Sequence, residues 1–96
     1  MDSISREKGR EVASRIASGW GLSNEQREQL LDQPDAVPQV ITIHDSLHRI
    51  FENRDQADSW IKKPNDAFNK RSGLDVMLGG DLEHVRKYLK NHLYNA

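Results

Sequence analysis

The sequence predicts an all-α protein, a compact bundle of five to six short helices. Two observations lead to this prediction. Apolar residues recur at helical spacing in nearly every segment, and each of these segments is bounded by a capping residue, a glycine or a proline. At 96 residues the chain has the size of one folded unit, and its hydrophobic share of 35% is lean. We therefore expect marginal stability, which a partner would raise.

The first two predicted helices lie between the N-terminus and residue 31. An apolar stripe at a spacing of four residues marks the first helix. Gly21 follows this stripe and is suited to end the helix in a left-handed conformation. Ser23 and Gln26 have the spacing of a capping box and predict a second, short helix that ends at about Leu30 or Leu31. The stripe of the first helix comprises Val12, Ala13, Ile16, Ala17 and Trp20.

Pro34 and Pro38 predict a break of about six residues before the third helix. The stretch "VITI" at residues 40–43 is rich in β-branched residues and by itself is compatible with a strand. Its apolar positions continue at helical spacing as far as residue 51, so we predict a helix and no sheet anywhere in the chain. The stripe comprises Val40, Ile43, Leu47, Ile50 and Phe51.

Three capping residues predict the remaining helices. Asn53 caps a helix that stops before Pro64, and we expect Trp60 of this helix to pack inside the core. Ser72 caps a helix that ends at the glycine pair, residues 79 and 80. Asp81 caps the last helix. Its apolar face comprises Leu82, Val85, Leu89 and Leu93. We expect Trp60 to pack against Leu47, Phe51 and the part of this face formed by Leu82, Val85 and Leu89.

Composition excludes several classes of function. The net charge is −1, so the chain has no overall basic field that would attract nucleic acid. There is no cysteine, which excludes disulfides, thiolate catalysis and cysteine-bound zinc, and suits a reducing compartment. The N-terminal residues do not resemble a secretory signal, and no apolar run is long enough to cross a membrane. We expect a cytoplasmic protein that does not bind membranes.

Candidate metal and catalytic groups are sparse. His44 and His48 lie four residues apart on the predicted third helix, a spacing that can bind zinc, but no third ligand is evident nearby. A solvated helix face is the favoured interpretation of the pair. Ser46, His44 and Asp45 do not point together on a helix, so they form no nucleophile, base and orienting group. We therefore expect no enzyme activity, no metal and no cofactor.

Residues 60–81 combine a proline, an aromatic residue and a cluster of cations. Pro64 turns the chain, and Asn65 can hold the turn by bonding its own backbone. Two interpretations remain open for Phe68, which lies in this polar loop. It either buries its ring as part of an ordered connector, or it forms the apolar anchor of an interface whose rim is charged. The cations of that rim are Lys62, Lys63, Lys70 and Arg71.

The stretch "LHRIFENRDQADSWIKKPNDAFNKRSGLDVMLGGDLEHVRKYL", residues 47–89, resembles the C-terminal toxin-binding domain of the MbcA/ParS/Xre antitoxins. The family has a leucine-rich helix ending in phenylalanine, a tryptophan helix and a Pro-Asn-x-x-Phe turn. A Ser/Pro-Leu-Asp helix, a glycine pair and a Val-x-x-Tyr-Leu helix follow, and all of these elements occur here in order. One departure is Gly73, where the family often has proline or alanine, and it should loosen the first turn of that helix.

A weaker resemblance precedes this domain. The stretch "IASGWGLSNEQREQLL" is similar to the start of the family's N-terminal helix-turn-helix region. The family continues with a recognition helix rich in Arg and Trp, whereas here the short and nearly uncharged "DQPDAVPQVITIHDSL" follows Leu31. We therefore expect residues 1–37 to be a vestigial helix-turn-helix-like region and residues 38–96 to be the helical toxin-binding domain. DNA binding by the isolated chain is not expected.

The resemblance implies an antitoxin of a type II toxin-antitoxin system. Its partner would be a RES-type toxin, which consumes NAD or transfers ADP-ribose from it, and the antitoxin would cover the toxin's active-site cleft. A homo-oligomer within the toxin complex is a further expectation. The alternative function is a DNA-binding transcriptional repressor of the Xre-like type. The toxin-binding residues we expect are Pro64, Asn65, Phe68, Lys70 and Arg71 of the loop and Lys87, Lys90, Asn91 and Tyr94 of the last helix.

Overall fold

The computed structural model describes the backbone of residues 2–95 and the side chains of residues 7–91. Over these residues the fold is all-α, as predicted. The helices are α1 (Asp2–Gly19), α2 (Asn24–Leu31), α3 (Ala36–Ile50), α4 (Arg54–Lys62), α5 (Gly73–Leu78) and α6 (Leu82–Asn95). The prediction that the chain contains no sheet is wrong in one place. Strands β1 (Pro64–Asn65) and β2 (Arg71–Ser72) pair between α4 and α5 and enclose a short 3-10 helix, Asp66–Phe68.

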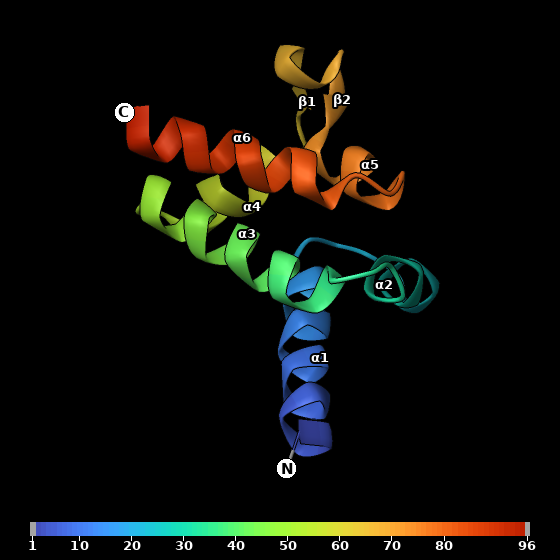
Figure 1. Ribbon diagram of the computed structural model, residues 1–96. Coiled ribbons are helices and arrows are strands. Elements are labelled where there is room, and N and C mark those ends of the chain that lie inside the picture. The colour runs from blue at the N-terminus through green and yellow to red at the C-terminus, as the bar shows by residue number, and fades with distance from the viewer. Residues whose placement is uncertain (1, 96) are drawn as a thin grey trace.

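Helix α3 lies at the centre of the bundle and packs against α1 on one side and α6 on the other (Figure 1). The first turns of α1 extend away from the rest of the bundle, and the β1–β2 hairpin projects at the opposite end of the molecule, beyond α6. Helix α4 packs against α3 and α5, and α2 contacts α1, α3 and α5. The helix predicted from "VITI" is therefore confirmed, and it is the element that joins the two halves of the chain.

The core is one continuous cluster of buried apolar side chains. On α1 the predicted stripe is shifted, because Ala13, Ala17 and Trp20 are buried whereas Val12 remains 46% exposed. Ile16 packs against the cluster from its edge. Helix α1 thus buries the narrower, alanine-lined part of its stripe, which lets it approach α3 closely. The largest fully buried side chains elsewhere are Leu30, Val40, Ile43, Leu47, Ile61, Phe68, Val76, Met77, Val85 and Leu89.

The predicted helix ends are confirmed where capping residues defined them. Ser23 and Ser72 each form a complete capping box, with Gln26 and Asp75 respectively. The Asn53 side chain accepts hydrogen bonds from the first backbone N–H groups of α4. These bonds satisfy N–H groups that have no partner within their helix. Gly21 has φ +87°, the left-handed conformation expected after α1.

The start of α3 differs from the prediction. Pro38 lies inside the first turn of α3, so the break between α2 and α3 is shorter than the two prolines indicated. Proline is tolerated there because the first N–H groups of a helix have no intrahelical acceptor to lose. Asp35 precedes the helix with a left-handed φ of 57° and makes no side-chain capping bond. The chain therefore turns sharply at Asp35 and enters α3 directly.

One set of polar contacts ties α1 to the end of α2, and another ties the segment after α2 to α5. Arg10 of α1 donates to the backbone oxygen of Leu31 over 3.1 Å and forms an ion pair with Asp32 at 3.0 Å. The Gln33 side-chain amide donates to the backbone oxygen of Met77 in α5 over 2.9 Å. Side chains thus supply donors to backbone carbonyls at the C-terminal ends of α2 and α5, where such groups commonly lack helical partners.

Candidate functional site

The hairpin between α4 and α5 is held by its own backbone and by Asn65. Asn65 pairs with Arg71 in the antiparallel ladder, and its side chain accepts from the Ala67 N–H over 2.9 Å. The Lys70 N–H in turn donates to the Asn65 backbone oxygen over 2.9 Å. Asn69 and Lys70 have φ values of 56° and 66°, so the chain reverses through two successive left-handed residues. The hairpin is therefore an ordered element that presents its exposed side chains in a defined direction.

The Phe68 ring is buried beneath this hairpin. It is only 1% exposed, and its edge-to-face neighbours are His84 at 5.1 Å, Tyr88 at 5.2 Å and Trp60 at 6.2 Å between ring centroids. Of the two interpretations of Phe68, the burial of its ring favours the ordered connector. The ring holds the hairpin on α6 from within.

Trp60 lies at the edge of the core, and the expectation that it fills the interior is wrong. Its side chain is half-buried, and the indole stacks on Tyr88 with centroids 5.9 Å apart and an interplanar angle of 12°. Phe68, not Trp60, is the fully buried aromatic residue of this part of the chain. We define Trp60, Phe68, His84 and Tyr88 as the aromatic cluster, which joins α4, the hairpin and α6. Sequence spacing does not reveal it, because its members come from three separate elements.

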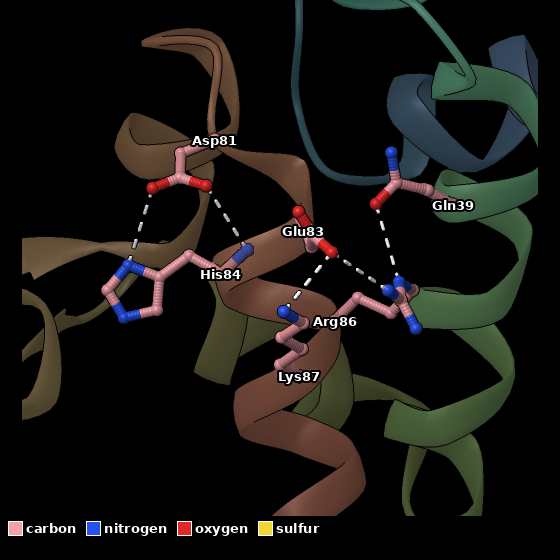
Figure 2. Close-up of polar contacts among 6 residues, drawn as sticks. All are labelled: Gln39, Asp81, Glu83, His84, Arg86 and Lys87. Atoms are coloured by element: carbon pink, nitrogen blue, oxygen red, sulfur yellow. Dashed lines mark hydrogen bonds and ion pairs between the residues drawn. The ribbon is translucent and has the colours of Figure 1, made fainter.

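Ion pairs order the first turns of α6 (Figure 2). Asp81 accepts from the His84 N–H over 3.3 Å, and its second oxygen lies 3.6 Å from His84 Nδ1. Glu83 pairs with Lys87 at 3.2 Å and with Arg86 at 3.6 Å. These exposed pairs contribute little stability. They show, however, that the cations Arg86 and Lys87 already have a partner, Glu83, within the chain.

Arg86 links α6 to α3. Its Nε donates to the Gln39 side-chain oxygen over 3.4 Å (Figure 2). The contact lies on the side of α6 that faces α3. It fixes the orientation of the first half of α6 relative to the centre of the bundle.

The aromatic cluster joins the two elements that carry the predicted binding residues, because Phe68 of the hairpin packs against His84 and Tyr88 of α6. In the loop, Pro64, Lys70 and Arg71 are exposed, whereas Asn65 is half-buried. On α6, Lys87, Lys90 and Asn91 are exposed. Lys87 and Asn91 line a surface hollow of about 350 Å³ that is also lined by His84 and Tyr88 of the cluster. The Tyr94 side chain lies outside the described residues.

Comparison with known families identifies this part of the chain. Residues 46–94 match the family described as the antitoxin Xre/MbcA/ParS C-terminal toxin-binding domain. The chain belongs to the Xre/MbcA/ParS antitoxin family. The match includes α4, the hairpin, α5 and nearly all of α6, so every described member of the aromatic cluster lies within the toxin-binding domain. The partner of this domain is therefore a toxin, and the chain is a protein of the antitoxin family.

One curated relative extends the comparison beyond the toxin-binding domain. The chain is 31% identical over 102 residues to an uncharacterized protein, y4oB, of Sinorhizobium fredii (strain NBRC 101917 / NGR234). The alignment includes 82% of this chain and 79% of the relative. No solved structure is significantly similar to the chain.

His44 and His48 lie one turn apart on α3. The His44 and His48 rings are 4.3 Å apart, and the pKa of His44 is lowered, chiefly by burial and next by the charge of His48. Among the described residues no three potential metal ligands gather in one place. No described helix is long and apolar enough to cross a bilayer.

Proposed function

We propose that this antitoxin-family protein neutralises a RES-type toxin, one that consumes NAD or transfers ADP-ribose from it, by docking over the toxin's active-site cleft. One observation carries the proposal. The hairpin and α6 form a single surface of the toxin-binding domain, because the buried Phe68 ring packs against His84 and Tyr88 of α6. A surface that spans two rigidly joined elements is suited to cover a cleft by shape.

The contact residues of the proposed surface are Pro64, Asn65, Lys70 and Arg71 of the hairpin and Lys87, Lys90, Asn91 and Tyr94 of α6. Phe68 would act through the fold, by positioning the hairpin. Lys70 and Lys90 are exposed and form no ion pair within the described part of the chain, unlike Lys87. Such cations favour encounter with an acidic surface more than they add to affinity.

The proposal is tested by co-expression with a RES-type toxin encoded beside this gene, with cellular NAD and growth as readouts. Full-length protein is expected to bind the toxin and to restore NAD. Deletion from Lys90 onward is expected to abolish protection. The melting of the truncated protein must be measured in parallel, because the deletion also removes part of α6. A folded truncation that still protects would contradict the proposed role of the end of α6.

Charge reversal separates specific contacts from general electrostatics. Arg71→Glu is expected to weaken toxin binding only modestly, because single rim charges usually contribute little. Lys8→Glu, an equal charge change on the exposed part of α1, is the matched control and should leave binding unchanged. If the intact protein binds no RES-type toxin, the proposed function fails as a whole.

We further expect the protein to act in the cytoplasm and more than one copy to be present in the toxin complex.

A second candidate function is DNA-binding repression. Helices α2 and α3 follow one another through a short turn, as in a helix-turn-helix unit. The exposed positions of α3 disfavour this function, since they include Thr42, Asp45 and Arg49 and thus carry little net positive charge. Much of α3 is also occupied by its contacts with α1 and α6. We therefore favour toxin binding as the function of the isolated chain.

A further inference from the structure

A second hollow lies on α4, outside the residues proposed above for toxin contact. It has a volume of about 400 Å³ and opens to solvent. Phe51 and Trp60, both half-buried, supply its apolar walls, and Lys63 is exposed at its rim. The hollow lies within the toxin-binding domain. Its lining residues are Phe51, Asp55, Gln56, Ser59, Trp60 and Lys63.

The α4 hollow is linked to the hollow on α6 by a pair of stacked rings. Trp60 lines the α4 hollow, Tyr88 lines the α6 hollow, and the two rings are stacked at 5.9 Å. One pair of rings therefore contributes to both hollows. Half-buried Trp and Tyr side chains beside a pocket are the residues that most often dominate protein interfaces, because they bury a large area at a small entropic cost.

The charges around the α4 hollow define the chemistry of its occupant. Lys63 is exposed and forms no ion pair with any described residue, whereas the neighbouring Lys62 side chain lies toward Gly21 at the end of α1. Lys70 and Arg71 of the hairpin are exposed cations of the same domain. Asp55 is in the first turn of α4, where the helix dipole stabilises a carboxylate. Asp55 and Lys63 are the two charged residues of the lining, and Lys63 is the one that a partner carboxylate can pair with.

We propose that the α4 hollow receives an apolar side chain of the toxin, and that a carboxylate next to this side chain pairs with Lys63. This inference rests on the proposed function and extends the toxin interface from the hairpin and α6 to α4. The apolar side chain would lie against the exposed faces of Phe51 and Trp60. The carboxylate would gain a charge-assisted hydrogen bond at the rim, where its desolvation cost is small.

Two variants test the proposal by isothermal titration calorimetry with the toxin captured by co-expression. Gln56→Trp changes an exposed lining residue and should fill the hollow, which is expected to weaken binding by at least about tenfold. Lys63→Glu reverses the rim charge and should weaken binding by a factor of about three or more, with a reduced dependence on salt. Glu7→Trp and Lys8→Glu, at exposed positions of α1, are the matched controls and should bind normally. Circular dichroism establishes whether each variant is folded. If Gln56→Trp does not fold, the affinity of the Lys63→Glu protein tests the proposal by itself.

A direct readout uses the two tryptophans of the natural sequence. Fluorotryptophan-labelled protein should give one fluorine resonance for Trp20, which is buried under α1, and one for Trp60. Unlabelled toxin is expected to shift the Trp60 resonance and to leave that of Trp20 in place, with Trp60→Phe providing the assignment. Tight toxin binding with an unmoved Trp60 resonance, or normal affinity for both variants, would overturn this inference and leave the proposed function intact. Failure to bind any RES-type toxin would overturn both.

Discussion

The Gln33 side-chain amide donates a hydrogen bond to the backbone oxygen of Met77 over 2.9 Å and so joins the segment after α2 to the end of α5. The two residues are separated in sequence by the whole of α3, α4 and the hairpin. This bond, together with the continuous apolar core, makes the N-terminal helices part of the same folded unit as the toxin-binding domain. The N-terminal region therefore supports the toxin-binding domain.

Loss of the Gln33 bond should destabilise the protein. Gln33→Ala is expected to lower the free energy of unfolding by about 1 kcal/mol, as for a typical partly buried hydrogen bond. Gln29→Ala is the matched control, because Gln29 is exposed and its contact with the Leu78 oxygen is long, at 3.5 Å. Urea unfolding measures both. Equal effects of the two substitutions would contradict the role assigned to Gln33.

Phe68 should contribute more to stability than Trp60. Phe68→Ala removes a fully buried ring and is expected to cost about 3–5 kcal/mol, which approaches the whole stability of a small domain. Trp60→Ala removes a half-buried ring and should cost less. Thermal or urea unfolding of the two variants gives the order. A Trp60→Ala protein that is less stable than Phe68→Ala would show that the core is centred on the indole.

Gly73 and Ile61 should be energetically coupled. A Cβ atom at Gly73 would lie 3.0 Å from Ile61 Cδ1, so alanine requires the isoleucine to shift. Gly73→Ala gains about 0.4–1 kcal/mol by restricting the unfolded chain, and the contact with Ile61 opposes this gain. Ile61→Val removes Cδ1 and should by itself cost about 0.5–1.5 kcal/mol. In a double-mutant cycle, Gly73→Ala is expected to be more favourable in the Ile61→Val background. Additive effects would show that the core absorbs the extra methyl group freely.

Stability should fall on mild acidification because of His44. Burial, and then the charge of His48, lowers the His44 pKa below its ordinary value of 6.5, although Asp45 and Asp58 oppose the shift. A lowered pKa means that the folded state favours the neutral imidazole. Its contribution to stability is therefore present above pH 6.5 and is lost as the pH falls through the folded-state value.

The pH dependence is measured by urea unfolding between about pH 8 and about pH 5, the range over which histidine titrates. His44→Gln should flatten the decline in stability. His48→Gln should raise the His44 pKa in an NMR titration, because it removes the cationic neighbour. An unchanged slope in the His44→Gln protein would assign the acid sensitivity to other groups.

The isolated chain should bind duplex DNA weakly and without sequence preference. The helix in the recognition position, α3, has Asp45 among its exposed residues and lacks a basic face. An electrophoretic shift with the chain's own promoter at physiological salt is expected to show only non-specific binding that disappears as salt rises. Nanomolar, sequence-selective binding would instead establish the repressor function.

The sequence by itself determined the helical class and most helix ends. Ser23, Ser72 and Asn53 cap their helices as predicted, and Gly21 has the predicted left-handed conformation. These features are readable because a cap and its acceptor lie within three residues of each other, so the physical cause is local. The order of motifs from Leu47 to Leu89 likewise indicated the family, which the match over residues 46–94 confirms.

Only the tertiary structure decided which aromatic residues are buried and which hollows they line. Phe68 is interior and Trp60 peripheral because the rings of His84 and Tyr88 cover Phe68, and both belong to a helix that begins after α5. Val12 remains exposed because α1 turns the face that carries Ala13 and Ala17 toward the core. Burial depends on neighbours that are distant in sequence, and hydrophobic spacing describes only the face of one helix at a time. The α4 hollow, and the stacking of Trp60 on Tyr88 that links it to α6, are consequences of that packing.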